Sequence, residues 1–454
     1  MSDYEKEERL CGRIAQRVAE KGGTAYYVGG WVRDRLMGIP NKDVDMEVHG
    51  IAPAVLREIL EGFGERITVG ESFGVYTLKG YSIDIAMPRR ETVRGLGHRD
   101  FDICVDPFAG TRAAAMRRDF TVNALMQNVL TGEIVDAFGG RDDLRQGILR
   151  HVSDASFAED ALRVLRGAQF AARFGFSVAP ETAALCRKMS LRHLARERVM
   201  DEVKKALCKA DRPSVFFTFL RDVDKLQDWF PELQALIGVE QPPEHHAEGD
   251  VWTHTMMVLD AAASFRNRVR EPFAFMLSAL CHDFGKAVCT ETTDGVIHAL
   301  GHETKGLPLA EAFVRRLTDA HLPMQYVRNL TEYHMKPNKM AADGASIKAT
   351  NRLFDASVDP EALVYLALAD GLGKLPQTTA SEAFLHERLE LFKEYMKRPY
   401  VMGRDLIEAG LAPSPMFSAV LAYAHKLRLA GVDKQNALKQ TLAYAKQLEK
   451  RGGA

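Results

Sequence analysis

The residues best suited to chemistry in this sequence are Asp43 and Asp45, two carboxylates separated by one valine. Side chains two residues apart on a strand point to the same face, so both carboxylates can hold the same divalent cations. Gly29 and Gly30 stand upstream, between a predicted strand and a predicted helix that carries Arg33. A glycine turn before a helix lets backbone N–H groups approach phosphate oxygens. The stretch is therefore typical of a site for metal and triphosphate.

The segment GGWVRDRLMG followed by DVD resembles the signature of the polymerase-beta-like nucleotidyltransferases. More narrowly, it is similar to the bacterial (class II) tRNA nucleotidyltransferases, or CCA-adding enzymes, and to the related bacterial poly(A) polymerases. The resemblance implies that Asp43 and Asp45 bind Mg²⁺ and that Gly29, Gly30 and Arg33 position the triphosphate. It also implies a third carboxylate on a neighbouring strand, for which Asp84 is the candidate. The alternative is that Asp84 is an edge-strand aspartate without a catalytic role.

Composition sets wide limits. The chain has 454 residues, a net charge of −1 and six cysteines without a C-x-x-C pair. This length predicts two to four domains, and the cysteine spacing argues against a zinc ribbon or a disulfide framework. Near-neutrality means that RNA contacts must use local basic patches. We find no signal peptide and no apolar run of membrane-spanning length, so we expect a cytoplasmic protein without membrane contact.

The pattern of apolar residues predicts the elements that position these groups. An amphipathic helix is expected at residues 4–21, with Leu10, Ile14 and Val18 on its apolar face. The following elements are expected at 25–28 (strand), 31–37 (helix), 54–62 (helix), and 66–69, 75–78 and 82–86 (strands).

Residues 88–107 are polar, contain glycine and have no clear periodicity, so we expect a loop. The segment resembles the flexible loop that is thought, in this family, to switch the pocket between CTP and ATP. Relatives that add only CC have a shortened loop, so its presence favours addition of the terminal A. A surface loop of no special role is the alternative.

The segment MRRDFTVNALMQN places a cationic cluster beside an apolar stretch. Arginine suits phosphate and ribose because its planar fork offers paired donors. The segment is similar to the R-R-D-x-x-x-N motif of the family, which implies nucleotide contacts by Arg118, Asp119 and Asn123, with Arg118 on the triphosphate. A strand, a turn at Gly139-Gly140, a short helix and a last strand are expected to close this domain near residue 152.

A helix is predicted at residues 157–176, where Asp160, Arg163 and Arg166 are spaced three apart and form one polar ridge. The segment resembles the E-D-x-x-R helix that acts as a protein template in the family. By resemblance, Asp160 and Arg163 pair with C or A, and Arg166 supports them or contacts phosphate. Gln169 departs from the family, which commonly has arginine there. An ordinary helix with surface ion pairs is the alternative.

Two helical stretches are rich in basic residues. Residues 180–225 have more basic than acidic side chains between Arg187 and Lys209, a surface suited to the phosphates of an acceptor stem. From Lys426 onward, seven basic residues against two acids leave a local excess of 7 − 2 = +5, which resembles a tail that holds the tRNA elbow. A charged solvated face is the alternative in both places.

Histidine and aspartate recur on helical segments from residue 242 onward. Imidazole and carboxylate suit Mg, Mn, Fe, Ni or Zn. The order of His254, His282-Asp283 and Asp370 resembles the HD phosphohydrolases. His302 and His334 are candidates for a second metal. Some CCA-adding enzymes carry such a domain with metal-dependent phosphatase and cyclic phosphodiesterase activity. The alternative is a decayed helical domain that keeps these residues by chance.

The predicted fold is an α+β head of the polymerase-beta-like nucleotidyltransferase class at 1–150, followed by an all-α neck at 151–235, an HD domain at 236–375 and a helical tail at 376–454. The expected activity is template-independent addition of CCA to tRNA from CTP and ATP, with Mg²⁺ in the head and Mg²⁺ or a divalent transition metal in the HD domain. Three alternatives stay open: an A-adding or CC-adding specialist, a bacterial poly(A) polymerase, and an HD phosphohydrolase whose inactive head binds RNA.

Overall fold

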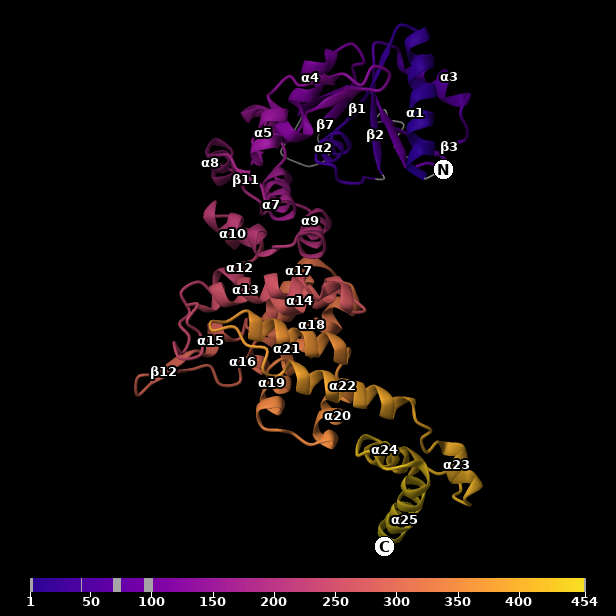
Figure 1. The fold of residues 1–454 in the computed structure, drawn as a ribbon, viewed down its shortest axis with the longest axis vertical. Helices are drawn as coiled ribbons and strands as arrows, with labels where there is room; N and C mark the ends of the chain where they lie inside the picture. Colours follow the sequence, from indigo (N-terminus) through magenta and orange to yellow (C-terminus); the bar gives the residue numbers. More distant parts are fainter. Residues whose placement is uncertain (1–2, 42, 68–74, 94–100, 453–454) are drawn as a thin grey trace. The chain divides into compact units, whose positions relative to one another are not determined.

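The computed structural model describes residues 3–41, 43–67, 75–93 and 101–452. The chain divides into two compact units, residues 1–194 with 222–225, and residues 195–221 with 226–454. The larger sheet belongs to the first unit, and helices make up most of the second (Figure 1). The predicted α+β head followed by helical domains is therefore confirmed as a fold class, and the finer boundaries at 150, 235 and 375 stay predictions.

The first unit is built on a seven-stranded sheet with the order β3-β4-β5-β2-β1-β8-β9. Its strands are β1 (Thr24–Val28), β2 (Val44–His49), β3 (Arg66–Ile67), β4 (Val75–Leu78), β5 (Ile83–Ala86), β8 (Met126–Asn128) and β9 (Ile134–Val135). The pairing of β2 with β5 is parallel, and the other pairings in this sheet are antiparallel. Residues that are partners in the register of β2 and β5 have their side chains on the same face of the sheet.

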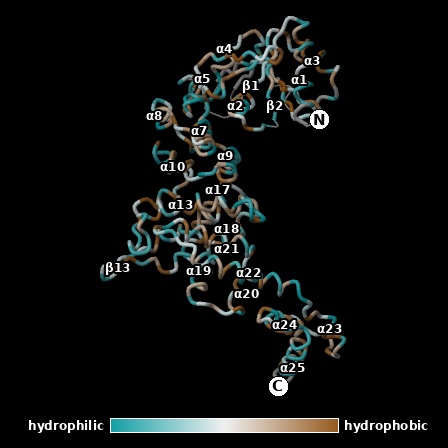
Figure 2. Tube along the Cα trace, in the orientation of Figure 1, coloured by the Kyte–Doolittle hydropathy of each residue, from teal (hydrophilic) through white to brown (hydrophobic). Residues whose placement is uncertain are grey.

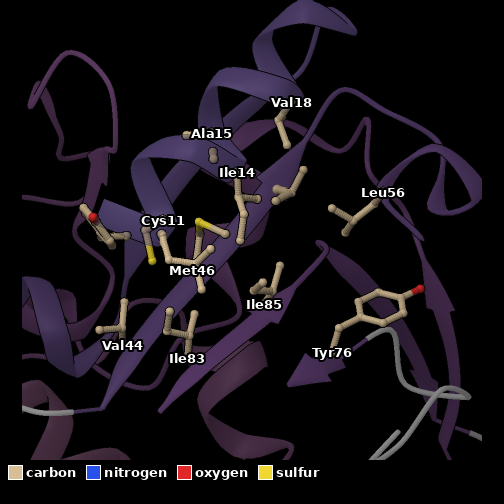
Figure 3. Packing of buried hydrophobic residues seen from close by; sticks show 14 of the residues in the cluster. Cys11, Ile14, Ala15, Val18, Val44, Met46, Leu56, Tyr76, Ile83 and Ile85 are labelled. Atoms are coloured by element: carbon tan, nitrogen blue, oxygen red, sulfur yellow. The ribbon is translucent and has the colours of Figure 1, made fainter. Parts of the chain in front are cut away.

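The core of this unit lies between one face of the sheet and the helices α1 (Asp3–Glu20) and α3 (Pro53–Glu61). Figure 3 shows Ile14 and Val18 of α1 above Met46 and Ile85 of the sheet. Each such side chain contributes about 1.5–3 kcal/mol when it is fully buried. The predicted amphipathic helix is confirmed, within a residue at each end. Since Met46 and its neighbours at i±2 face α1, the alternate residues of β2 face away from the core.

Shorter elements complete the first unit. They are α2 (Gly30–Leu36), β6 (Arg89–Val93), β7 (Phe101–Val105), α4 (Gly110–Met116), η2 (Thr121–Asn123), α5 (Gly140–Gln146), β10 (Ile148–Leu149), α6 (Asp154–Ala158), α7 (Leu162–Phe174), β11 (Ser177–Val178) and α8 (Pro180–Lys188). The small strands β10 and β11 pair in parallel.

The expectation of a loop at 88–107 is wrong for its two ends. Strands β6 and β7 pair antiparallel from Arg89 with Val105 to Val93 with Phe101, and residues 94–100 lie outside the described part. The sequence carries a strand signal there, because Phe101, Ile103 and Val105 alternate with other residues. The glycine-containing, polar middle of the segment obscured that alternation.

The second unit is a bundle around α14 (Pro272–Cys281), whose residues from Ala274 onward are all buried. A helix that is apolar on every side belongs in a core, and α14 packs on several of the surrounding helices. The helices of this bundle other than α14 are α9 (Arg196–Lys209), α10 (Ser214–Asp222), α11 (Leu226–Trp229), α12 (Pro231–Gln234), α13 (Val251–Ala263), η3 (Arg266–Arg268), α15 (Lys286–Cys289), α16 (His302–Lys305), α17 (Leu307–Leu317), α18 (His321–Tyr333), α19 (Met335–Ala342), α20 (Ile347–Ala356) and α21 (Pro360–Leu372).

A two-stranded hairpin interrupts the helices, formed by β12 (Glu291–Thr293) and β13 (Val296–His298). Asp294 and Gly295 form its turn with φ of 53° and 79°. Two consecutive positive φ values fit the type I′ turn that an Asp-Gly pair favours. The sequence analysis did not anticipate this hairpin, although the dipeptide is a strong hairpin signal.

The chain ends in α22 (Glu382–Lys397), α23 (Gly403–Glu408), α24 (Phe417–Leu429) and α25 (Lys434–Gly452). The predicted break between the last two helices is confirmed at Gly431, where φ is 78°. No described helix is long and apolar enough to cross a membrane. Figure 2 agrees, since hydrophilic and hydrophobic residues alternate along the helices.

Candidate active sites

Three carboxylates meet on the face of the head sheet that points away from the core. Asp45 of β2 and Asp84 of β5 are partners in the parallel register, and the exposed Asp43 immediately precedes β2. Burial raises the pKa of Asp45; Arg118 opposes this increase, while the charges of Asp84 and Asp43 add to it. The three predicted carboxylates therefore lie close together, and a divalent cation would reduce the repulsion between their negative charges. Carboxylate oxygens are the ligands that Mg²⁺ prefers.

The predicted glycine turn lies beside this acidic face. Gly29 follows β1 with φ of 65°, and a Cβ there would lie 3.3 Å from Nη1 of Arg118 and 3.6 Å from Oδ2 of Asp45. A side chain at Gly29 would therefore crowd both groups. Gly30 begins α2, and a Cβ there would lie 3.4 Å from Nη2 of Arg33.

The first unit has a cavity of about 240 Å³, whose lining does not include Asp43, Asp45 or Asp84. Arg117, Arg118 and Arg163 line it together with Glu47. Guanidinium groups bind phosphate oxygens through paired, charge-assisted hydrogen bonds. The cavity is therefore suited to the anionic end of a nucleotide.

Four of the residues predicted to contact the nucleotide do not line this cavity but bond to one another. Arg33 is 4% exposed; its Nε donates to Asp34 at 2.8 Å and its Nη1 donates to Asn123 at 2.6 Å. Asp119 accepts from Nδ2 of Asn123 at 3.0 Å and from Nε of Arg166 at 2.7 Å. Arg33, Asn123 and Asp119, which are buried, thus form one network with the half-buried Arg166 between α2 and α7.

The predicted polar ridge is only partly formed, because Asp160 is not on the helix. It lies between α6 and α7, where its Oδ1 accepts the N–H of Leu162 at 3.1 Å. Aspartate side chains compete in this way for backbone donors at helix starts. Arg163 is on α7, and its two terminal nitrogens donate to the carbonyls of Ser156 at 2.7 Å and Arg117 at 2.8 Å.

Gln169, the departure from the family pattern, is 1% exposed. Its Nε2 has no hydrogen-bond partner among the described residues. The amide therefore lies within the helix packing and not at the surface.

A second site is formed by the histidine and aspartate residues of the second unit. Its members are His254 on α13, His282 and Asp283 at the end of α14, His302 on α16, His334 between α18 and α19, and Asp370 on α21. Within the described residues, two of the groups with three ligand atoms inside 4.8 Å consist of these six: His254, His282 and Asp370, and Asp283, His302 and His334.

Asp283 lies at the centre of this cluster. Its Oδ1 is 3.3 Å from Nε2 of His302 and 3.6 Å from Nε2 of His334. Its Oδ2 is 3.3 Å from Nε2 of His282 and 3.5 Å from Nε2 of His254. One carboxylate therefore stands between two pairs of imidazoles, as a bridging ligand between two cations would.

The histidine rings are held so that their Nε2 atoms converge. The Nδ1 atoms of His282, His302 and His334 lie 2.7–2.8 Å from the carbonyls of Ala279, Ala299 and Thr331. A carbonyl only accepts, so each Nδ1 carries the proton and each Nε2 offers a lone pair. Nε2 of His254 lies 3.1 Å from Oδ1 of Asp370, and Oδ2 of Asp283 lies 2.7 Å from Nζ of Lys286. Nε2 of His282 and Oδ1 of Asp283 are buried without a hydrogen-bond partner in the described part. Buried polar atoms are rarely unpaired, and bound metal would satisfy these.

A cleft of about 560 Å³ leads to this cluster. Asp283, His302 and Asp370 line it from the cluster. Four lysines share the lining, namely Lys286, Lys336, Lys339 and Lys374. The cleft therefore offers an anion a path to the imidazoles.

Comparisons with known proteins agree with the head motifs. The poly A polymerase head domain family matches residues 25–150, and the probable RNA and SrmB-binding site of polymerase A matches 175–237. A multifunctional CCA protein of Pasteurella multocida is 37% identical over 398 residues, covering 85% of this chain and 91% of that one. The chain belongs to the multifunctional CCA protein family. Another member, from Actinobacillus pleuropneumoniae, is 39% identical over 70% of this chain and 76% of its own.

Solved structures extend the likeness in fold over almost the whole chain. The Thermotoga maritima CCA-adding enzyme complexed with tRNA has a TM-score of 0.66 at 21% identity, covering 96% of this chain and 94% of that one. The Bacillus stearothermophilus CCA-adding enzyme in complex with CTP also has a TM-score of 0.66 at 21% identity, covering 99% and 100%. The head and helical body of this family member thus share their fold with CCA-adding enzymes.

Beside each site of this family member lies a glutamate with a buried side chain that was not predicted from the sequence. Glu47 of β2 accepts from His49 at 2.8 Å and from Arg118 at 3.2 Å. Burial works to raise the pKa of Glu47, but His49 and Arg118 outweigh it and lower the pKa. The signal was present, because Glu47 continues the alternation of Asp43 and Asp45 on the same face.

At the second site, Glu248 holds two imidazoles. Its Oε1 lies 2.7 Å from Nδ1 of His246 and 3.0 Å from Nδ1 of His254. Its Oε2 accepts the N–H of Leu375 at 2.8 Å. Glu248 thus orients His254 as carboxylates orient metal-binding histidines. An acid six residues before His254 in the sequence carries no periodic signal.

Proposed function

We propose that the chain adds C, C and A to the 3′ end of tRNA from CTP and ATP, without a nucleic-acid template. The supporting observation is the register of Asp45 with Asp84 beside Arg118, in a member of the multifunctional CCA protein family. Structures titled as CCA-adding enzymes with tRNA, ATP and CTP share the fold. A tRNA substrate also favours a cytoplasmic location.

In this proposal Asp43, Asp45 and Asp84 hold Mg²⁺ in the head. Bound Mg²⁺ supplies the charge that lowers the pKa of the attacking 3′-hydroxyl and neutralises the leaving pyrophosphate. Arg118 holds the triphosphate from within the cavity, and Gly29 keeps the space between Arg118 and Asp45 open. The 3′-hydroxyl then attacks the α-phosphate in line.

The residues proposed to select the base are at the start of α7 and just before it. Arg163 lines the cavity and Asp160 lies three residues before it, so together they offer donors and an acceptor to the edge of C or A. The network of Arg33, Asn123, Asp119 and Arg166 holds α7 in place from behind. Basic residues near α8 and α9 are proposed to contact the acceptor stem, and the tail the elbow.

The test uses three labelled tRNAs that end at the discriminator base, at C and at CC, supplied with Mg²⁺, CTP and ATP. Extension of all three to CCA, read at single-nucleotide resolution, is the expected result. Extension of only the CC-ended tRNA would identify an A-adding specialist, and a stop after CC a CC-adding one. An open-ended A tail would identify a poly(A) polymerase, the name carried by the family that matches the head.

We also propose that the second unit is a metal-dependent phosphohydrolase acting on phosphate at RNA 3′ ends. The supporting observation is that the Nε2 atoms of four histidines, His254, His282, His302 and His334, lie 3.3–3.6 Å from the carboxylate of Asp283. Four imidazoles and two carboxylates favour a divalent transition metal over Mg²⁺. The lysines of the cleft provide charge for the phosphate.

Two variants separate the activities, and each is the control for the other. Asp45→Asn should abolish nucleotide addition and keep hydrolysis of a 2′,3′-cyclic phosphate end. Asp283→Asn should abolish metal retention and hydrolysis and keep nucleotide addition. Full nucleotide addition by Asp45→Asn would overturn the head assignment and support the alternative of an RNA-binding head. Unchanged hydrolysis by Asp283→Asn would overturn the second assignment.

A further inference from the structure

The side chain of Asn41 makes two hydrogen bonds at the entrance to β2. Its Oδ1 accepts the backbone N–H of Asp43 at 3.0 Å. Its Nδ2 donates to Oδ2 of Asp34 at 2.9 Å. A carboxamide can accept on one side and donate on the other, so Asn41 joins the backbone of Asp43 to helix α2.

The bonds continue from Asp34 to helix α7. The other oxygen of Asp34 accepts from Arg33, Arg33 donates to Asn123, Asn123 donates to Asp119, and Asp119 accepts from Arg166. We call these five residues, with Asn41, the Asn41–Arg166 series. Arg33, Asp34, Asn123 and Asp119 are each at most 7% exposed. Buried, charge-assisted bonds of this kind hold their geometry closely, because breaking one leaves a buried polar group unpaired.

Two aromatic rings of α7 contact the arginines of the same series. The guanidinium of Arg33 lies 4.5 Å from the ring centroid of Phe174 and 5.1 Å from that of Phe170. The guanidinium of Arg166 also lies 5.1 Å from the Phe170 centroid. A cation over a ring within about 6 Å is attracted to it, so a shift of α7 is transmitted to Arg33.

We propose that Asn41 is a positioning residue that couples the placement of Asp43 to helix α7. The metal-binding carboxylate and the base-reading helix then move as one body, and a base that fits α7 poorly also displaces Asp43. This inference rests on the proposed nucleotidyltransferase function, because it takes Asp43 as a metal ligand and α7 as the helix that reads the base.

Asn41→Asp is the decisive variant. The new carboxylate still accepts the N–H of Asp43, but it cannot donate to Oδ2 of Asp34 and its charge repels that oxygen. The link to α2 is therefore broken, whereas the bond to Asp43 is kept. The matched control is Asn128→Asp, because Oδ1 of Asn128 accepts from Leu130 at 2.9 Å and from Thr131 at 3.0 Å outside the series. Thermal unfolding of both variants checks that the head is folded.

The readout is calorimetric binding of CTP and UTP to the full chain with Mn²⁺, which needs no tRNA extension. Asn41→Asp should weaken Mn²⁺-dependent CTP binding about tenfold, the scale of one strong hydrogen bond. It should also bring the affinities for CTP and UTP closer together. Asn128→Asp should match the wild type in both respects.

Combining Asn41→Asp with Arg166→Lys tests the coupling itself. Residues in one network show non-additive effects, whereas distant independent residues are additive. The proposal expects the double variant to bind CTP no more weakly than the worse single variant. Additive losses, or wild-type selectivity in Asn41→Asp, would overturn the coupling. A wild type that prefers CTP over UTP but extends no tRNA would instead count against the proposed function alone.

Discussion

Asp45 and Asp84 lie opposite each other in the parallel register of β2 and β5. The hydroxyl of Thr77, on the neighbouring strand β4, donates to Oδ1 of Asp84 at 2.8 Å. The distant Asp84 is thereby oriented on the same face as the D-x-D pair. This register makes a carboxylate from another part of the chain available to the same cation.

Asp84→Asn should lower the rate of nucleotide addition about 100-fold, the scale of losing one charged group in a transition state. Asp84 is exposed, so the free energy of unfolding should change by less than about 0.5 kcal/mol. Thr77→Val removes only the orienting hydroxyl and should cost about fivefold in rate. Equal activity of Asp84→Asn and wild type, measured under single-turnover conditions, would show that Asp84 is only an edge-strand residue.

Gly29→Ala should raise the KM for CTP, because its Cβ would meet Arg118 and Asp45. Gly22→Ala is the matched control: Gly22 also has positive φ, at 83°, but a Cβ there has nothing within 4 Å. Both variants should lose stability from the positive φ, about 1–2 kcal/mol for Gly22→Ala. Gly29→Ala should lose more, because ψ at Gly29 is −135°, outside the left-handed helical region. Steady-state kinetics should then show a raised KM for CTP in Gly29→Ala only. Equal KM values in the two variants would contradict a role for the space between Arg118 and Asp45.

Glu47→Gln should raise the KM for CTP about tenfold with little change in kcat, because Glu47 holds Arg118 through a charge-assisted bond. The control is Glu65→Gln, which breaks a surface ion pair with Lys79. Exposed pairs of this kind contribute about 0–1 kcal/mol, so Glu65→Gln should behave as wild type. A loss confined to kcat in Glu47→Gln would argue for a direct part in the chemistry.

The sequence predicted the parts of the head site whose signals are local. Alternation along β2 placed Asp43 and Asp45 on one face, and the glycine pair marked the turn before α2. The burial of Arg33 could not be foreseen, because its partner Asn123 is 90 residues away. The break of the helix at Asp160 was also missed, since spacing of three residues does not reveal a side chain that caps the backbone.

At the second site the candidate ligands could be named from the sequence, because the order of His254, His282-Asp283 and Asp370 resembles that of the HD phosphohydrolases. The convergence of these six residues on one site depends on how five helical segments pack, which no local pattern encodes. Glu248 was missed for a similar reason, because its bond with the N–H of Leu375 joins distant parts of the chain.

Glu248→Gln should weaken metal binding about 10- to 100-fold, the usual effect of losing a carboxylate that orients a histidine ligand. Competition with a chromogenic chelator measures this affinity without any substrate. Glu311→Gln is the control, because Glu311 pairs with Arg328 on the surface of the same unit. Unchanged metal affinity in Glu248→Gln would show that His254 is oriented by the carbonyl of Gly373 alone, which lies 3.2 Å from its Nδ1.

The stability of the metal-free protein should fall as the pH rises from about 6.5 to about 9. Burial alone lowers the pKa of His254, but hydrogen bonds with Asp370 and Glu248 outweigh it and raise the pKa to about 9. The folded state therefore binds a proton more tightly than the unfolded state. That contribution is complete below the unfolded pKa of about 6.5, is lost as the pH rises through about 9, and amounts to at most about 3 kcal/mol.

Urea unfolding of chelator-treated protein at several pH values measures this slope, and His254→Gln should flatten it. Metal reverses the sign, because an imidazole ligand must be neutral and metal affinity therefore rises with pH. Metal-loaded protein should accordingly gain stability over the same range in which metal-free protein loses it. Parallel pH profiles for the two forms would mean that no metal displaces the proton of His254, and the assignment of that residue as a ligand would fail.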